Sequence, residues 1–420
     1  MELLRAFGHF VAGSALLVSR GRRGYYAWIG FLGLLIALGV HAYLNQLSHG
    51  LIVSNMRDQV SWGFYIGNFA YLVGVAAAAV VLVIPAYVYD WGPIKQVVLL
   101  GELMAVAAII MCILFVTVDV GRPERLWHLL PALGNPNFPY SLLVWDILVL
   151  NVYFLLNLFI VSYLLFKAYT GRKYNAGFIL PLIFLSIPMA ISIHTVTAFL
   201  FMGLKARPFW HTAILAPRFL ASAFCSGPAL LLLIFGVLRR VGRVSISNQA
   251  LYKIGELLAY AMAINLFFLA TEVFTDFYSP TAEVVHAEFQ WFGIHATGRT
   301  GMAKYSWLAL AFNSAAFLVF MVPMLRHRLR LLNAACVLAA AGVFIEKGMG
   351  LLLPGMTPDM LGEVYDYAPS LNEVMVGVGV WGVGALAFTL MAKVAMAIDV
   401  GELRYERSEG SPIGPSGWGA

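Results

Sequence analysis

Long apolar runs alternate with short polar segments along the whole chain. A helix needs roughly 20 apolar residues to cross the hydrocarbon core of a bilayer. Hydrophobic residues make up 61% of the 420 residues and charged residues only 11%, against roughly 25% charged in soluble domains. The pattern predicts an all-α polytopic membrane protein with about ten transmembrane helices, at residues 25–47, 62–89, 97–118, 141–166, 178–203, 213–239, 251–277, 304–325, 329–352 and 370–398.

Three segments follow from this pattern. Residues 1–24 hold a short apolar run whose basic residues come after it, whereas a signal peptide carries its charges ahead of the run. We therefore expect a cytoplasmic or interfacial helix there. Residues 25–400 form one membrane domain, and the Gly-, Pro- and Ser-rich residues 401–420 are expected to be a flexible cytoplasmic tail.

The basic residues predict the orientation. With the N-terminus inside, Lys and Arg divide 18 to 9 in favour of the inner segments. Cytoplasmic loops carry such an excess, so both termini are predicted to be cytoplasmic, in an inner membrane. The net charge of +6 follows from the same rule and gives no argument for a nucleic-acid partner.

A weak internal repeat predicts how the spans are grouped. Residues 101–105 read Gly-Glu-Leu-Met-Ala at the start of span three, and residues 255–259 read Gly-Glu-Leu-Leu-Ala at the start of span seven. Repeats of this kind are common in membrane proteins. We expect two four-helix bundles, spans two to five and six to nine, with spans one and ten peripheral.

Polar residues inside the spans are the candidate functional groups, because a charge at the bilayer centre costs at least ~2.5–3.5 kcal/mol unless it faces protein or water. Two of them, Glu102 and Glu256, lie about one turn from the predicted inner surface. The others gather toward the outer surface: Trp62, Tyr65, Asn68, Asp119, Asp146, His194, Glu272, Asp276 and Glu346. Some basic residues lie in the predicted outer loops, although the charge bias favours the cytoplasmic side. They are candidates for contacts with a partner protein: Arg122, Arg125, Lys205, Arg207 and Arg218.

Several of these residues also have purely structural interpretations. Trp62 and Tyr65 fit an interfacial aromatic belt. Asp119 can end a helix and pair with the arginine of the Gly-Arg-Pro that follows it. The glutamates of the repeat can extend to the membrane surface.

His194 is harder to explain structurally. It follows Pro181 and Pro188 in span five, and span six carries Pro217 and Pro228. Proline removes a backbone donor and bends a helix, which leaves carbonyl groups for water or a ligand. Bent helices beside a histidine and carboxylates predict a pocket for an amphiphile whose head group takes up protons.

Cysteine spacing gives no metal framework. Cys112, Cys225 and Cys336 stand singly in three spans, without a C-x-x-C pair. Glu283 and two histidines, His286 and His295, share one outer loop, but their spacing fits no metal pattern and we predict no metal site.

A glycine pattern at residues 377–382 matches the dinucleotide fingerprint. It lies inside an apolar span with no strand before it, where small residues let helices pack closely. We therefore expect helix packing there and no nucleotide site.

The polar motifs together resemble one known family. They are Trp-Gly-Phe-Tyr-Ile-Gly-Asn-Phe at 62–69, Asp-Val-Gly-Arg-Pro-Glu-Arg at 119–125, Trp-Asp at 145–146, His-Thr-Val-Thr-Ala-Phe at 194–199, Ala-Arg-Pro-Phe-Trp at 206–210 and Ala-Pro-Arg-Phe at 216–219. The chain resembles the NrfD-like (polysulfide-reductase membrane-subunit) family over about residues 25–400. Within it, the ten-span form looks most like the DsrP type, the quinone-interacting subunit of DsrMKJOP complexes in sulfur metabolism, and it is also similar to the membrane subunit of the high-molecular-weight cytochrome complex.

The resemblance implies a quinone site near the outer face and no haem or iron–sulfur cluster in this chain. It implies a ferredoxin-like iron–sulfur subunit docked on the extracytoplasmic side, and further haem and iron–sulfur subunits in the same complex. Quinone-binding members use the helices that match spans two and five, which here means Trp62, Tyr65, Asn68 and His194. Some relatives place a histidine where Ser61 stands here, so the quinone ligands stay open.

The mechanism we expect is quinone-linked electron exchange. Menaquinone or another quinone enters from membrane lipid and meets His194, with Tyr65 or Asn68 on the ring or the second carbonyl. Asp119 and Asp146 exchange protons with it. The loops at 119–140, 204–213, 278–303 and 353–370 dock the partner. A proton path would run through the remaining acids: Glu102, Glu256, Glu272, Asp276 and Glu346.

Two other classes of protein remain open at this point. A b-type cytochrome needs axial ligands within the membrane, and His41 and His194 are the histidines inside spans. A secondary transporter would also show repeats and buried proton-coupling carboxylates.

Overall fold

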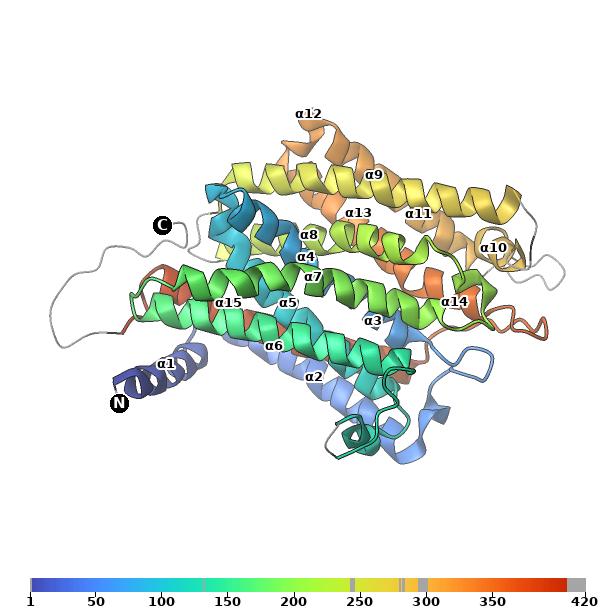
Figure 1. Ribbon diagram of the computed structural model, residues 1–420, viewed down its shortest axis with the longest axis horizontal. Coiled ribbons are helices and arrows are strands. Elements are labelled where there is room, and N and C mark those ends of the chain that lie inside the picture. The colour runs from blue at the N-terminus through green and yellow to red at the C-terminus, as the bar shows by residue number, and fades with distance from the viewer. Residues whose placement is uncertain are drawn as a thin grey trace.

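Ten apolar helices long enough to cross a membrane make up most of the molecule, which confirms the predicted fold class. A computed structural model describes residues 2–130, 133–241, 246–278, 281, 284–293 and 301–405 (Figure 1). These residues contain no strand. The spans are α2 (Arg23–His49), α3 to η2 (Phe64–Val88), α5 (Gly92–Asp119), α6 (Leu142–Tyr169), α7 (Ala176–Met202), α8 (Leu215–Val241), α9 (Asn248–Tyr278), α11 (Ala303–Met321), α13 and α14 (Leu329–Met356) and α15 (Leu371–Asp399).

Shorter elements connect the spans. They are α1 (Glu2–Ser19), η1 (Leu51–Val53), η3 (Pro123–Leu129), η4 (Pro208–Trp210), α10 (Val284–Trp291) and α12 (Pro323–Arg326). The helix expected before the first span is present as α1, while its place at a membrane surface stays a prediction. Most of the tail expected at 401–420 lies outside the described residues.

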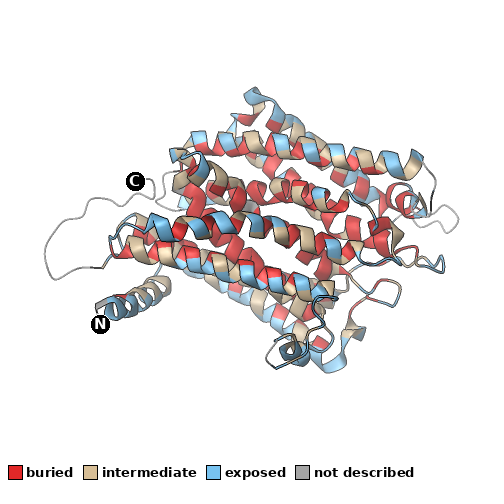
Figure 2. Cartoon of the chain, in the orientation of Figure 1, coloured by how far each residue is buried: buried red, intermediate tan, exposed pale blue. Residues whose placement is uncertain are grey.

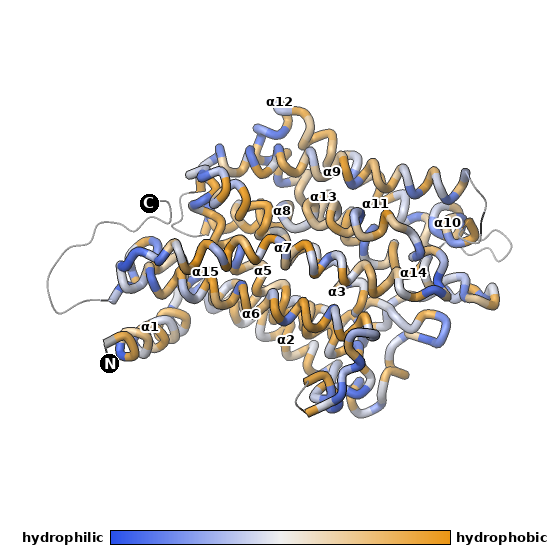
Figure 3. Tube along the Cα trace, viewed as in Figure 1, coloured by the Kyte–Doolittle hydropathy of each residue, from blue (hydrophilic) through white to orange (hydrophobic). Residues whose placement is uncertain are grey.

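The first and last spans pair antiparallel. The Trp28 indole donates to the Thr389 hydroxyl over 3.2 Å, and the Asn45 side-chain amide donates to the side-chain oxygen of Asn372 over 3.1 Å at the other end of the pair. The end that holds Arg23 and Asp399 is called the proximal end below, and the end that holds His49 and Leu371 the distal end. Hydrophilic residues gather at both ends and hydrophobic ones fill the middle (Figure 3).

Glycines make the contact between α2 and α15 close. A Cβ on Gly39 would lie 2.5 Å from the Cα of Gly379, and a Cβ on Gly379 would lie 2.6 Å from the Cα of Gly39. Neither position accepts a side chain without separating the helices. The glycine pattern at 377–382 therefore serves helix packing, as predicted.

The eight inner spans form two four-helix bundles. In the N-terminal bundle α3 packs on α5, α5 on α6 and α6 on α7; in the C-terminal bundle α8, α9, α11 and α13 pack on one another. The bundles meet where α3, α4 and α7 contact α8. Helix α2 reaches the bundles mainly through α15, and only 17% of its most hydrophobic stretch is buried, against 83% for α5 (Figure 2). The predicted grouping of the spans is confirmed.

Two spans are interrupted. The second span breaks at Ala77 into α3 (Phe64–Ala76) and α4 (Ala78–Val83), and then widens into the π-helix η2 (Ile84–Val88) at Pro85. The ninth span leaves helical geometry at Gly348, between α13 (Leu329–Lys347) and α14 (Met349–Met356). Irregular backbone at membrane depth is tolerated where it is buried in protein. The break at Gly348 lies against Gly67 of α3, at the boundary between the bundles.

Candidate functional site

His194 has an unused hydrogen-bonding atom in the interior of the protein. It lies late in α7 and is 0% exposed. Its Nδ1 is 2.9 Å from the carbonyl oxygen of Ala190, one turn earlier, whereas its Nε2 is buried without a partner among the described residues. A carbonyl only accepts, so Nδ1 must carry the proton of this hydrogen bond. The neutral ring therefore presents Nε2 as an acceptor.

Asp146 lies beside the same helix. It is buried near the start of α6, and the hydroxyl of Thr197, one turn after His194, donates to its Oδ1 over 2.6 Å. The same hydroxyl lies 2.7 Å from the carbonyl oxygen of Ile193. The Thr197 hydroxyl has one proton and can donate it to only one of these two oxygens at a time. Both contacts are hydrogen bonds together only when Asp146 is protonated and donates to the hydroxyl oxygen, while the hydroxyl donates to the Ile193 carbonyl. The arrangement accommodates Asp146 with or without its proton.

Lys347 brings a buried amine to this region, and the sequence analysis missed it. It is the last residue of α13 and only 4% exposed. Its Nζ donates to the carbonyl oxygen of Phe219 over 3.1 Å and lies 4.4 Å from the centre of the Phe219 ring. It lies close enough to the His194 ring for the charge state of one group to influence the other. A lysine directly after Glu346 in an apolar run was the signal available in the sequence.

Helix α3 makes room for this lysine. A Cβ on Gly74 would lie 3.4 Å from Lys347 Nζ and 3.3 Å from the hydroxyl of Ser226 in α8. Any side chain at this position would crowd both groups. Asp146, His194, Thr197 and Lys347 are called the His194 cluster below, and they come from α6, α7 and α13.

Arg218 lies inside the protein, which corrects its predicted place in an outer loop. It belongs to the first turn of α8 and is 6% exposed. Its guanidinium pairs with Glu272 of α9 and, over 3.2 Å, with Glu346 of α13. A buried arginine held by two carboxylates is not presented to a docking partner. The predicted span at 213–239 already contained this position, so its place inside a helix was visible in the sequence.

Two amides complete this set of contacts. Asn265 of α9 and Asn313 of α11 donate to Oε2 of Glu346 over 3.3 and 2.7 Å. Arg218, Glu272, Glu346 and the two asparagines are called the Arg218 network. It links all four helices of the C-terminal bundle. Asp276, one turn beyond Glu272, is half-buried.

The polar residues of α3 face away from His194. Tyr65 donates to the side-chain oxygen of Gln46 in α2 over 2.7 Å. The oxygen of Asn68 accepts from the indole of Trp381 in α15 over 2.9 Å. On the same helix it is Gly67 and Gly74 that face the C-terminal bundle. The structure therefore places Tyr65 and Asn68 against the peripheral spans.

Trp62 lies in an aromatic group at the distal end. Its ring stacks on Trp210 of η4 at 6.1 Å between centroids and meets Phe201 of α7 edge-on at 5.5 Å. Trp62 therefore contacts the helix that carries His194, whereas the hydrogen bonds of Tyr65 and Asn68 lead to α2 and α15.

A second carboxylate group gathers around Glu373, which the sequence analysis also missed. Glu373 is fully buried in the first turn of α15, where it forms a capping box with Ser370 and accepts from the Tyr367 hydroxyl. Burial and the neighbouring Glu373 charge raise the pKa of Tyr367. Tyr65 and Asp119 lie within electrostatic range of Glu373. The Ser-x-x-Glu spacing before an apolar run was the available signal.

Asp119 belongs to this Glu373 group and not to the His194 cluster. Its Oδ1 is buried without a partner among the described residues. Arg122 pairs with Glu124 over 3.5 Å, so the interpretation in which Asp119 pairs with that arginine is wrong.

The two glutamates of the sequence repeat differ in their surroundings. Glu102 is 2% exposed, and its Oε2 has no partner among the described residues. Glu256 is half-exposed, pairs with Lys253 over 3.0 Å and with Arg326 over 3.9 Å, and lines an open cavity of about 510 Å³ at the proximal end. Glu256 thus extends to the surface, whereas Glu102 does not.

Three of the five basic docking candidates are exposed at the distal end. Arg122 and Arg125 follow α5, and Lys205 follows α7. Arg207 instead donates to the carbonyl oxygen of Met356 over 2.8 Å and ties η4 to the end of α14. The exposed three are available to a partner.

The histidines considered as metal or haem ligands are dispersed. His41 is exposed on α2, while His194 is fully buried on α7. His286 contacts the carbonyl oxygen of Pro354 through Nδ1 over 2.7 Å. Glu283 and His295 lie outside the described residues.

Comparison with known proteins agrees with this architecture. The family model described as "Polysulphide reductase, NrfD" matches residues 52–357, which cover both four-helix bundles. A putative membrane subunit of the dimethyl sulfoxide reductase of Halobacterium salinarum is 28% identical over 86% of this chain and 88% of its own length. A selenate reductase subunit of Mesobacillus selenatarsenatis is 23% identical and an Hdr-like menaquinol oxidoreductase integral membrane subunit of Archaeoglobus fulgidus 24% identical, each over 88% of this chain and 93% of its own length. With two bundles matched from end to end, this ten-span chain belongs to the polysulphide reductase NrfD family.

Proposed function

We propose that this protein is the membrane subunit of a quinone-linked redox complex. It exchanges electrons between menaquinone, or another quinone, and an iron–sulfur partner, and it moves the accompanying protons. Family membership supports this, as do relatives named as membrane subunits of a dimethyl sulfoxide reductase and of a menaquinol oxidoreductase. The proposal extends to sulfur metabolism and a complex of the DsrMKJOP type, on the motif resemblance.

The observation that carries the proposal is the unpartnered Nε2 of His194. A buried polar atom without a hydrogen bond is costly and in native proteins is usually explained by function. A quinone accepts two electrons and two protons and a quinol releases them, so its oxygens need a group that both accepts and donates. Neutral His194 accepts from a quinol hydroxyl, and protonated His194 donates to a quinone carbonyl.

Asp146 is the next group for the proton. It contacts Thr197, one turn from His194, and its hydrogen bonds fit both of its protonation states. General acid–base groups of this kind contribute typically 10²–10⁴-fold to a rate. Lys347 acts as a positioning charge beside His194. Asp119, Glu102, Glu272, Asp276 and Glu346 remain proposed members of a longer proton path.

The redox partner is proposed to dock at the distal end. Arg122, Arg125 and Lys205 are exposed there and favour an acidic partner surface. If both termini are cytoplasmic, the distal end is extracytoplasmic. The electron carriers are assigned to a ferredoxin-like iron–sulfur subunit and further haem and iron–sulfur subunits, since Cys112, Cys225 and Cys336 lie on three different helices.

Substitution of His194 tests the proposal in the assembled complex. His194→Gln keeps much of the side-chain volume, and His194→Ala removes it. We expect both to reduce quinol-linked turnover by at least about 100-fold, with the redox subunits still co-purifying. Ile191→Ala, at an exposed position of the same helix, is the control and should keep turnover. Unchanged quinone kinetics in His194→Gln would remove His194 from the site.

A further inference from the structure

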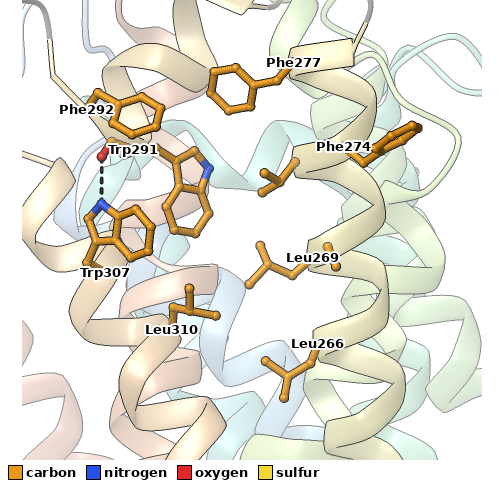
Figure 4. Close-up of a pocket in the computed structure, with 10 residues that line it drawn as sticks. Leu266, Leu269, Phe274, Phe277, Trp291, Phe292, Trp307 and Leu310 are labelled. Atoms are coloured by element: carbon orange, nitrogen blue, oxygen red, sulfur yellow. Dashed lines mark hydrogen bonds between the residues drawn. The ribbon is translucent and has the colours of Figure 1, made fainter.

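A groove of about 450 Å³ opens between α9, α10 and α11 in the C-terminal bundle (Figure 4). It lies on the outward side of the bundle, because Phe274 of α9 is 63% exposed and Trp307 of α11 is 51% exposed. In a membrane this side faces lipid. Its volume falls within the ~300–1,000 Å³ of ordinary ligand sites.

The lining changes character along the groove. Aromatic rings surround one end, from Phe277, Trp291, Phe292 and Trp307. Leucines line the other end, toward the middle of the helices, from Leu266, Leu269 and Leu310. Flat rings favour a flat ring as a partner, in offset or edge-on contact. The lining therefore suits a ligand with a planar head and an apolar chain.

One polar atom points into this lining. The indole nitrogen of Trp291 is directed into the groove in Figure 4, and the residue is 6% exposed. It makes no hydrogen bond with any described residue, whereas the neighbouring Trp307 indole donates to the Trp291 carbonyl oxygen over 2.9 Å. A buried indole N–H usually finds an acceptor. A carbonyl on the ligand head would supply one.

A small cavity lies directly behind the groove. It shares Leu269, Trp291 and Leu310 with it and adds Ser306 and Glu346. Its volume of about 10 Å³ is roughly that of one water molecule. The aromatic end of the groove is thus separated from the Arg218 network by little more than a water site.

We propose that this groove binds an isoprenoid quinone at a second site, distinct from the His194 cluster. The ring lies among the aromatic side chains, one carbonyl accepts from the Trp291 indole, and the isoprenoid chain follows the leucines. A phospholipid fits less well, because it has no ring and its head group stays in water. The choice of a quinone as the ligand rests on the proposed function. The residues that line the groove belong to the C-terminal bundle, whereas His194 and Asp146 belong to the N-terminal bundle.

Two matched substitutions on α9 test it with the full chain in nanodiscs that contain menaquinone-4 as the probe. Ala270→Trp fills the groove from an exposed lining position, and Ile264→Trp adds the same ring at an exposed position outside it. Bound menaquinone-4 is counted by mass spectrometry. We expect two equivalents for the wild type and Ile264→Trp, and one for Ala270→Trp. Trp291→Phe should weaken the second site by roughly 2- to 10-fold, the effect of one hydrogen bond.

The outcomes separate this site from the one at His194. His194→Gln should lose the first equivalent and keep the one that Ala270→Trp removes. Equal stoichiometry in Ala270→Trp and Ile264→Trp would overturn the groove site and leave the His194 proposal standing. So would brominated phosphatidylcholine that quenches the Trp291 emission, taken as the difference between wild type and Trp291→Phe, equally with and without menaquinone-4, because the groove would then hold phospholipid.

Discussion

The two bundles bury polar residues in different states. In the C-terminal bundle Arg218 is held by Glu272 and Glu346, and two asparagines donate to the second oxygen of Glu346. In the N-terminal bundle the titratable atoms His194 Nε2 and Glu102 Oε2 are buried with no partner among the described residues, whereas the unpartnered atoms of the Arg218 network are the neutral amide oxygens of Asn265 and Asn313. The two bundles, which share a sequence repeat, thus differ in how their buried titratable groups are paired.

This difference distinguishes polar groups that stabilise the fold from polar groups that can bind a ligand or a proton. A buried charge that is fully paired holds helices together and is costly to break. A buried titratable atom without a partner forms no bond between helices and is open to a ligand or a proton. We therefore assign the ion pairs of Arg218 to assembly of the C-terminal bundle, where Glu272 and Glu346 also stay in the proposed proton path, and the His194 cluster to the reaction.

The largest expected effect comes from breaking the Arg218 network. Arg218→Leu leaves two buried carboxylates without their cation, which should destabilise the protein by about 3–5 kcal/mol. Thermal unfolding of the purified protein would measure this. Arg122→Leu is the control, since Arg122 is exposed and its pair with Glu124 should contribute at most about 1 kcal/mol. If Arg218→Leu unfolds like wild type, the network is not what holds the bundle.

Lys347→Met should affect the reaction more than the fold. Methionine fills a similar volume and needs no partner, so we expect a smaller stability loss than for Arg218→Leu. Quinol turnover should fall by roughly 10-fold or more, an effect within the range of general acid–base groups. Its pH profile should also change, because a charge acting on His194 has gone. If Lys347→Met changes the stability of the protein but leaves the pH profile of turnover unaltered, Lys347 has a structural role only.

Thr197 and Thr195 form a matched pair on α7. Thr197 donates to Asp146, whereas Thr195 donates to the carbonyl oxygen of Ile191 in its own helix. Thr→Val keeps the shape and removes the hydroxyl. Thr197→Val should reduce proton-coupled turnover by about 10-fold, the effect of one hydrogen bond to a charged group, and Thr195→Val should leave it unchanged. Equal effects in the two variants would contradict the role of Asp146.

The smallest effects are expected at the proximal end, where the two glutamates of the sequence repeat, Glu102 and Glu256, can be compared with each other. Glu102→Gln removes a titratable group from a buried position and should lower proton-coupled turnover by a few-fold. Glu256→Gln changes a half-exposed glutamate with ion-pair partners and should have almost no effect. Proton uptake by reconstituted complex would measure both. A larger effect at Glu256 than at Glu102 would place the proximal end of the proton path in the C-terminal bundle.

The spans were predictable to within a few residues, because the thickness of the bilayer sets their length and composition marks them. The partners of polar residues were not. Arg218 was expected on a surface and is buried, and Asp119 was expected beside His194 but interacts with Glu373. Lys347 was overlooked although it lies next to a predicted residue. Each of these depends on which face of a helix meets which neighbour.

The apolar runs by themselves determined that the described part of the chain holds ten membrane-length helices, that Gly379 serves close packing, and that His194 and Asp146 lie within these helices. Only the tertiary structure decided that Asp146 lies beside the helix that carries His194 and that Lys347 reaches this region from the C-terminal bundle. It also decided that aromatic side chains of α9, α10 and α11 line a groove on the C-terminal bundle. The physical reason is that solvation in lipid acts on each residue alone, whereas a hydrogen bond or an ion pair requires two helices to meet at the same height and on the matching face.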